Sequence, residues 1–101
     1  IVTQNGVPFL QPAELASTIS KFHRLFRSCG CYVATIPTYV GGPMAMGIGT
    51  DDEFVKAVTL EVLEHRFAAA GFKTRYYTPE VHKAAFAHPA YVHEIVEAAR
   101  K

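Results

Sequence analysis

The sequence predicts an α/β fold, and more specifically the closing edge of a doubly wound parallel sheet whose first strands are missing from the chain. An apolar strand end precedes an amphipathic helix, two β-rich runs joined by a glycine-rich turn come next, and helical segments complete the chain. A strand, a helix and a hairpin do not make a complete sheet, so we expect residues 1–101 to be part of a larger domain. The opening Ile1-Val2-Thr3, without Met, also favours a chain cut from a longer one.

The composition is that of a folded protein without a strong charge bias. Half of the 101 residues are hydrophobic and 19% are charged, so a core can form and disorder is not expected. Ten Lys and Arg against nine Asp and Glu leave a formal charge of +1, which is too balanced for an electrostatic nucleic-acid binder. Two cysteines are too few for a disulfide scaffold and favour reduced thiols, so we expect a cytoplasmic location.

The first half of the chain predicts a strand and then a helix. Residues 1–6 are typical of the last part of a buried strand that runs into a loop at Gly6. From Pro12 to Arg27, apolar residues recur at spacings of four, three and four, as on one face of an amphipathic helix: Leu15, Ile19, Phe22 and Phe26. Gly30 is a candidate stop just beyond this helix.

A β-hairpin is predicted in the centre. No residue between Arg27 and Asp51 carries a formal charge, but prolines and glycines interrupt the segment too often for a transmembrane helix. Residues 31–36 are β-rich, 40–43 have turn chemistry and 44–48 make the return strand. The connection is too short for a helical crossover, so the two strands should be antiparallel.

The second half predicts three helices. Thr50 and Glu53 have the spacing of a capping box, so a helix is expected from there to about Ala70, closed by Gly71. Its inward positions would be Phe54, Val58, Val62 and Leu63. After an extended link over 73–77, Thr78 and Pro79 begin a further helix. Pro89 interrupts that helix, and residues 90–99 form the terminal one.

Several candidate sites fail on their spacing. The glycine-rich stretch 41–49 lacks a phosphate-loop pattern, and the acidic residues 51–53 after it would repel a phosphate. His82, His88 and His93 do not have the spacing of a zinc motif, and Cys29-Gly30-Cys31 has no second cysteine pair. Structural turns and partnered side chains are therefore favoured over a nucleotide or metal site.

Two polar residues stand at strand ends, where open α/β sheets bind ligands. Gln4 follows an apolar strand directly, and Tyr39 ends the run Ile36-Pro37-Thr38-Tyr39. Gln4 would face the ligand crevice if the first strand is parallel to the missing ones. The alternative is that Gln4 caps a turn and Tyr39 is an aromatic residue at the edge of the core. Spacing alone favours the alternative.

Three motifs give the chain a resemblance to a known family. They are Val2-Thr3-Gln4 at a strand end, the run Ile36-Pro37-Thr38-Tyr39, and residues 75–87, which read R-Y-Y-T-P-E-V-H-K-A-A-F-A. Together they resemble the C-terminal part of the catalytic domain of the spermidine synthases, the polyamine aminopropyltransferase family. The resemblance covers essentially all 101 residues, and the turn at 40–42 looks like the bacterial branch.

The resemblance implies a fold and an activity. The family's fold resembles the class I methyltransferases, with a Rossmann-like sheet that ends in a reversed hairpin strand. Its enzymes transfer an aminopropyl group from decarboxylated S-adenosylmethionine to putrescine, without a metal or other cofactor. Gln4 and Tyr39 match positions of the diamine pocket. A carboxamide oxygen and a phenol can hold an amine by hydrogen bonds and leave it nucleophilic.

The same resemblance implies that much of the site is elsewhere. The family's glycine-rich nucleoside motif, ribose-binding acid and paired aspartates match no stretch of this chain, so no catalytic residue is expected in it and the fragment alone should be inactive. A homo-oligomeric parent is expected. His88 stands where the family usually has Leu. The alternatives are a methyltransferase-like paralogue with another acceptor or none, and a structural, self-associating fragment.

Overall fold

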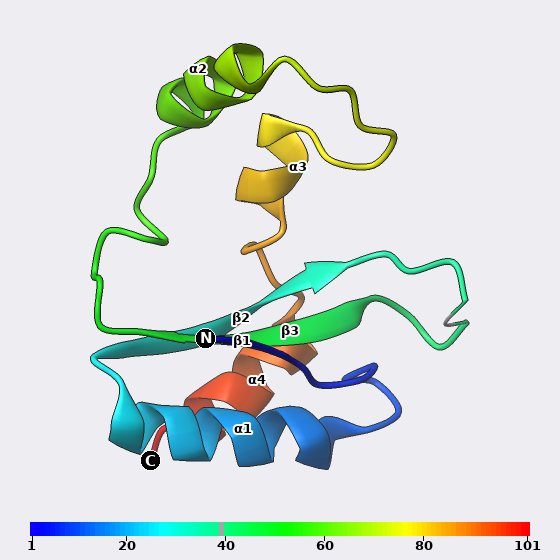
Figure 1. Cartoon of the computed structure of the whole chain (residues 1–101). Helices are drawn as coiled ribbons and strands as arrows, with labels where there is room; N and C mark the ends of the chain where they lie inside the picture. The colour runs from blue at the N-terminus through cyan, green and yellow to red at the C-terminus, as the bar shows by residue number, and fades with distance from the viewer. Residues whose placement is uncertain (39) are drawn as a thin grey trace.

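The computed structural model describes residues 1–38 and 40–101 of the chain. Its elements, labelled in Figure 1, are β1 (Val2–Gln4), α1 (Pro12–Leu25), β2 (Ser28–Ala34), β3 (Met44–Thr50), α2 (Leu60–Ala70), α3 (Pro79–Ala84) and α4 (Ala90–Ala99). The hairpin strands therefore begin or end a few residues from their predicted limits, because pairing runs from Ser28 opposite Thr50 to Ala34 opposite Met44.

The strands form one sheet in the order β1-β3-β2. Both β1 and β2 are antiparallel to β3, which confirms the predicted hairpin. It follows that β1 and β2 run in the same direction, with the reversed strand β3 between them. Two strands of the same direction thus flank one antiparallel strand, as expected for the closing edge of a doubly wound sheet.

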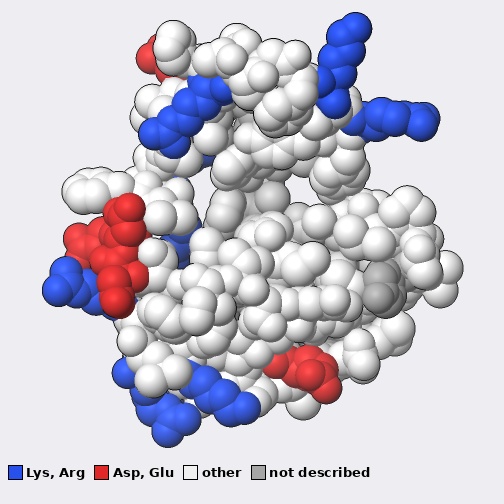
Figure 2. Space-filling model, viewed as in Figure 1, with Lys and Arg blue, Asp and Glu red and all other residues white. Residues whose placement is uncertain are grey.

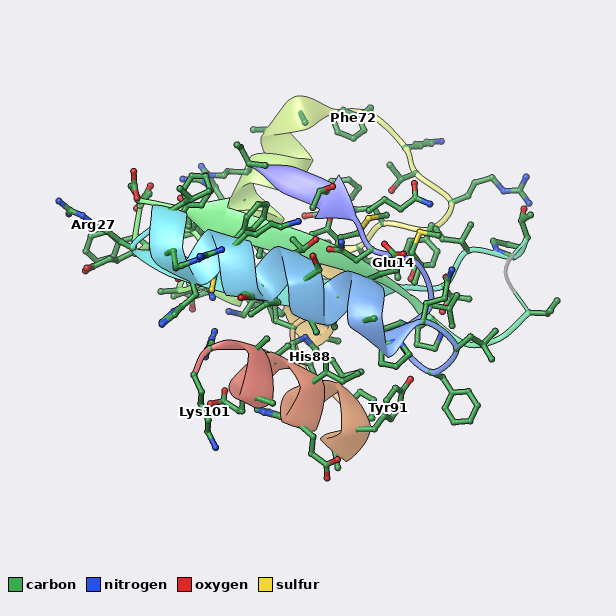
Figure 3. The ribbon with its side chains drawn as sticks, turned by 90° about the horizontal axis from the view of Figure 1, so that it is seen from below. Glu14, Arg27, Phe72, His88, Tyr91 and Lys101 are labelled. Atoms are coloured by element: carbon green, nitrogen blue, oxygen red, sulfur yellow. The ribbon has the colours of Figure 1, made fainter. Side chains whose placement is uncertain are left out.

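The core lies between the sheet and the pair α1 and α4, which lie side by side on one of its faces (Figures 1 and 3). Its buried members are Leu15, Ile19, Cys29, Cys31, Ala45, Val92 and Val96. Glycines on β3 let α1 approach the sheet closely. A Cβ on Gly49 would lie 2.6 Å from the ring of Phe26 and 2.9 Å from that of Phe22. The predicted inward positions Leu15 and Ile19 are confirmed, since both are fully buried.

The opposite face of the sheet lies below α2 and α3, which pack against each other (Figure 1). Ring contacts tie the two helices together: the ring centroids of Phe67 and Tyr77 lie 5.4 Å apart, and those of Tyr77 and His82 5.6 Å. Within the described residues, no helix has both the length and the apolar character needed to cross a membrane.

Three expectations about local structure are wrong. Gly30 does not end α1, because Phe26 already leaves the helix with extended backbone and Gly30 lies inside β2. Thr50 does not cap a helix, because β3 pairing continues through it. The hydroxyl of Thr50 instead accepts the Asp52 N–H at 3.0 Å in a turn. The first strand is not buried in this chain, since Ile1 is 72% exposed and Val2 53%.

The helix expected from Thr50 is consequently shorter. It begins at Leu60, where the Thr59 hydroxyl accepts the Val62 N–H at 3.3 Å. Of the predicted inward positions only Leu63 is buried, and Phe54, in the turns before the helix, is 77% exposed. The predicted end is confirmed, because Gly71 adopts a left-handed conformation with φ 70°.

The last two helices begin where the sequence predicts. The Thr78 hydroxyl accepts the Val81 N–H at 3.0 Å, with Pro79 in the first turn of α3. The terminal helix α4 runs over the predicted residues after Pro89, which has extended backbone.

Candidate functional site

The carboxyl ends of β1 and β2 meet at one edge of the sheet, because the two strands run in the same direction on either side of β3 (Figure 1). Gln4 ends β1 opposite Met46, and Ala34 ends β2 opposite Met44. The segment 35–43, which joins β2 to β3, leaves from the same edge. We refer to this region as the carboxyl edge.

Gln4 lies at the carboxyl edge, on the sheet face away from α1. Its neighbour Thr3 pairs with Gly47, and a Cβ on Gly47 would meet Thr18 of α1 at 2.9 Å and Thr3 at 3.5 Å. Thr3 therefore points toward α1, and alternation along the strand turns the exposed Gln4 side chain to the other face.

Asn5 holds this strand end in place. It is 5% exposed, and its Oδ1 accepts the Gly47 N–H at 3.0 Å. Its Nδ2 donates to the Thr18 hydroxyl at 2.6 Å, so one side chain ties β1, β3 and α1 together. Sequence reasoning missed Asn5, although a polar residue directly after a strand end was a visible signal.

The second predicted site residue, Tyr39, lies outside the described residues. The segment around it passes close to the loop that follows β1. A Cβ on Gly41 would lie 2.3 Å from Cδ1 of Leu10 and 3.5 Å from Val7, and Gly42 has φ +124°. The glycines predicted as turn residues thus let the chain segments after β1 and β2 lie against each other at the carboxyl edge.

Tyr76 reaches the same edge from the segment between α2 and α3. Its hydroxyl accepts the backbone N–H of Thr35, the first residue after β2, at 3.0 Å. Tyr76, Thr35 and Pro43 also line one small cavity of about 200 Å³. Sequence reasoning treated residues 73–77 as a simple link and missed this contact.

An apolar cavity of about 300 Å³ separates the sheet from α3. Tyr32, Ala34 and Ile48 line it from the sheet, and Tyr76, Val81 and Phe86 line it from the other side. Figure 2 shows openings between the part of the molecule formed by α2 and α3 and the part that contains the sheet. Among the polar groups that line this cavity, the Tyr77 hydroxyl lies 2.8 Å from Nδ1 of His82.

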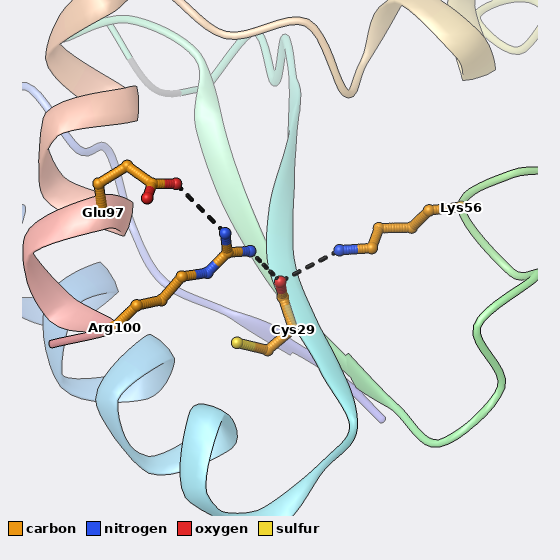
Figure 4. Close-up of polar contacts among 4 residues, drawn as sticks. All are labelled: Cys29, Lys56, Glu97 and Arg100. Atoms are coloured by element: carbon orange, nitrogen blue, oxygen red, sulfur yellow. Dashed lines mark hydrogen bonds and ion pairs between the residues drawn. The ribbon is translucent and has the colours of Figure 1, made fainter.

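The free edge of β2 is covered by hydrogen bonds from later segments. Near its start, Arg100 and Lys56 both donate to the Cys29 carbonyl, Lys56 at 3.1 Å, and Arg100 also pairs with Glu97 at 3.2 Å (Figure 4). Farther along, the Val33 N–H donates to the Ala85 carbonyl at 3.0 Å. These bonds satisfy backbone groups that an open strand edge would leave exposed.

His88 takes part in the same covering. Its Nε2 donates to the Cys31 carbonyl at 2.8 Å. Burial lowers the pKa of His88, the Cys31 carbonyl opposes that shift, and His93 and Lys56 add to it. Burial likewise raises the pKa of the Cys31 thiol to about 11, so this thiol stays protonated and is a poor nucleophile.

The described residues bring together no group of three or more His, Cys, Asp or Glu able to hold a metal ion. His82 and His88 have the partners given above, Tyr77 and the Cys31 carbonyl. Burial, and then the nearby Arg100 charge, lower the pKa of Lys56. Both cations already donate to the Cys29 carbonyl, so they complete the strand edge.

Comparison with known proteins confirms the family resemblance. The chain is 60% identical over 95 residues to the polyamine aminopropyltransferase of Ruegeria sp. (strain TM1040), which covers 94% of the chain and 34% of that protein. The polyamine aminopropyltransferase of Pseudomonas syringae pv. tomato is 46% identical over 91% of the chain and 32% of its own length. The chain thus spans about a third of the length of these curated relatives. No family model matches the chain.

Solved structures confirm the fold. The spermidine synthase of Thermotoga maritima superimposes with a TM-score of 0.79 at 21% identity, over 95% of this chain and 33% of that one. A spermidine synthase in complex with the transition-state analogue AdoDATO gives the same TM-score at 20% identity, over 96% and 33%. The match is to the C-terminal third of these proteins, whose fold is methyltransferase-like.

Proposed function

We propose that this chain, which corresponds to the C-terminal third of the polyamine aminopropyltransferases, is the C-terminal fragment of the catalytic domain of a bacterial spermidine synthase. In this proposal all 101 residues are one part of that domain. The parent enzyme transfers an aminopropyl group from decarboxylated S-adenosylmethionine to putrescine. The observation that carries the proposal is 60% identity across 94% of the chain.

The proposed reaction is a direct displacement. The lone pair of a neutral putrescine amine attacks the propyl carbon bonded to the sulfonium sulfur. The carbon–sulfur bond breaks and its electron pair stays on sulfur, so methylthioadenosine leaves. The secondary ammonium ion formed in this step loses one proton and becomes spermidine. Positioning of the amine and removal of its proton are what the protein contributes to such a step.

This chain would supply part of the diamine pocket. We assign Gln4 and Tyr39 to it, because Gln4 lies at the carboxyl edge and the segment that contains Tyr39 leaves β2 at the same edge. Ligands of open α/β sheets bind outside such strand ends. The nucleoside-binding loop and the acidic groups that accept the proton would come from the rest of the parent protein.

The test is an assay of the full-length protein that contains this chain. Incubated with putrescine and decarboxylated S-adenosylmethionine, it should form spermidine and methylthioadenosine in equal amounts. The isolated chain should form neither at a comparable rate, because loss of the catalytic base alone costs about 10²–10⁴-fold. If the full-length protein forms no spermidine in this assay, the proposal is overturned. Methylation of another acceptor would favour a methyltransferase-like paralogue.

Two variants of the full-length protein test the pocket. Tyr39→Phe removes one hydrogen bond to an amine, so kcat/KM for putrescine should fall roughly tenfold to a hundredfold. Gln4→Leu should act in the same direction, with KM for decarboxylated S-adenosylmethionine nearly unchanged in both. Unaltered kinetics with putrescine would instead favour the reading of Tyr39 as an edge aromatic and Gln4 as a turn cap.

The parent is also expected to be a cytoplasmic homo-oligomer. Sedimentation of the full-length protein and fractionation of the cells that produce it test these two expectations. A monomer, or a protein recovered outside the cytoplasm, would contradict them.

A further inference from the structure

We infer that Tyr76 is a positioning residue for the proposed diamine pocket: through the backbone of Thr35 it fixes the point at which the chain leaves β2. The inference rests on the proposed function for its kinetic consequence. Its structural basis is separate, since the Tyr76 hydroxyl accepts the Thr35 N–H at 3.0 Å.

Thr35 is the point where the segment leaves the sheet. Its predecessor Ala34 is the last residue of β2 to pair with β3. The Val33 N–H, two residues earlier, is already bound by the Ala85 carbonyl on the outer edge of β2. The Tyr76 hydroxyl extends this covering by one step and so sets the direction in which the chain departs from the strand.

The Tyr76 side chain also lies near the other end of the segment. Pro43, the residue before β3, lines the same cavity of about 200 Å³ as Tyr76 and Thr35. Both ends of segment 35–43 thus lie near one aromatic side chain. Because Tyr76 is 53% exposed, its hydroxyl adds little to the free energy of unfolding. Its main effect is therefore to hold the Thr35 backbone where the chain leaves β2.

The neighbouring Tyr77 provides a matched control. The Tyr77 hydroxyl lies 2.8 Å from Nδ1 of His82, five residues along the chain, whereas the Tyr76 hydroxyl binds Thr35, 41 residues away. The two phenols therefore contact different parts of the molecule. The change from Tyr to Phe removes the same group in both cases. Only Tyr76→Phe removes the acceptor of the Thr35 N–H.

The experiment compares Tyr76→Phe and Tyr77→Phe in the full-length protein. Tyr76→Phe should raise KM for putrescine about three- to tenfold, the equivalent of one neutral hydrogen bond, with smaller effects on kcat and on KM for decarboxylated S-adenosylmethionine. Its melting temperature should change little. Tyr77→Phe should lower the melting temperature and leave KM for putrescine near the wild-type value.

Hydrogen exchange of the Thr35 amide gives a readout that does not need activity. Exchange should be faster in Tyr76→Phe and unchanged in Tyr77→Phe. If wild-type protein makes no spermidine, the proposed function fails while the exchange result still tests the contact. Equal KM values for putrescine in wild type and Tyr76→Phe, in an active enzyme, would overturn the positioning role. Unchanged exchange would overturn the contact itself.

Discussion

The half-buried His88 side chain closes part of the open edge of β2. Its Nε2 donates to the Cys31 carbonyl at 2.8 Å. An apolar side chain could pack there but could not satisfy the carbonyl. Burial lowers the pKa of His88 although the bond to the Cys31 carbonyl opposes this shift, so the folded chain favours the neutral imidazole, whose Nε2–H donates to the carbonyl.

His88 should make stability depend on pH. Its folded pKa lies below the unfolded value of 6.5, so the unfolded chain binds the proton more readily in that window. Stability from His88 is therefore complete above pH 6.5 and is lost as pH falls from there toward the folded pKa. We expect the full-length protein to lose stability between pH 7.5 and 5.5 by more than its His88→Leu variant does.

Urea unfolding at the two pH values measures this difference. His88→Gln is the matched control, since its amide can donate to the Cys31 carbonyl but does not titrate. It should resemble His88→Leu in its pH dependence and wild type in its stability at pH 7.5. The same loss of stability on acidification in all three proteins would show that groups other than His88 carry the pH dependence.

The sequence could indicate which residues are polar at strand ends, but not which partners they have. Gln4 could be assigned to the carboxyl edge because it follows an apolar run. Asn5, Tyr76 and His88 act through contacts with Gly47, Thr35 and Cys31, which are 41 to 57 residues away along the chain. Spacing within one segment carries no information about such pairs.

At the scale of elements, β3 lies between β1 and β2 and also packs against α1. The glycines of β3 make its close contact with α1 possible. Gly47 faces Asn5 and Thr18, and Gly49 faces the rings of Phe22 and Phe26, each within 3 Å of the position that a Cβ would take. Side chains at these positions would push the helix away from the sheet.

Gly49→Ala tests this close approach. The added methyl group would lie 2.6 Å from Cδ2 of Phe26, so α1 or the ring must move. We expect the free energy of unfolding of the full-length protein to fall by about 1–3 kcal/mol. Adding Phe26→Leu should make room for the methyl group, so the double variant should be more stable than the sum of the two single effects predicts.

Gly71→Ala is the comparison for that experiment. Nothing lies within 4 Å of its Cβ position, and only its φ of +70° opposes a side chain. Its cost of about 1 kcal/mol should therefore be additive with Phe26→Leu. Additive behaviour of Gly49→Ala and Phe26→Leu would contradict a steric contact between α1 and β3.

Helix starts were predictable where their caps are local, and were mispredicted where strand pairing prevails. Thr78 and Pro79 begin α3, and α4 begins after Pro89, as expected. Thr50 and Glu53 have equally good local chemistry, yet Thr50 pairs with Ser28 across the hairpin. The pairing extends β3, and the helix begins only at Leu60, with Thr59 as its cap, because ladder bonds between distant residues outweigh one local cap.

At the scale of the whole molecule, α1 and α4 pack closely on one face of the sheet, whereas a cavity of about 300 Å³ separates the other face from α3. α1 and α4 bury the core, whereas β1 is an edge strand of the sheet that the described residues form. Val2, the first residue of that strand, is 53% exposed, and Ile1 just before it is 72% exposed. The structural relatives are about three times as long as this chain, so in the proposed parent further residues are available to cover this surface.

We therefore expect the isolated chain to self-associate. An exposed apolar edge strand and the open cavity of about 300 Å³ beneath α3 are surfaces that other copies can cover. Gel filtration at several concentrations should show oligomers or aggregates, and thermal unfolding should be broad.

Val2→Lys, which places a charge on the edge strand β1, should reduce this association. Leu25→Lys is the matched control, because Leu25 is also 70% exposed but lies at the end of α1. A wild-type chain that elutes as a monomer with a sharp cooperative melt would contradict the prediction, and equal effects of the two lysines would show that net charge rather than the β1 edge controls association.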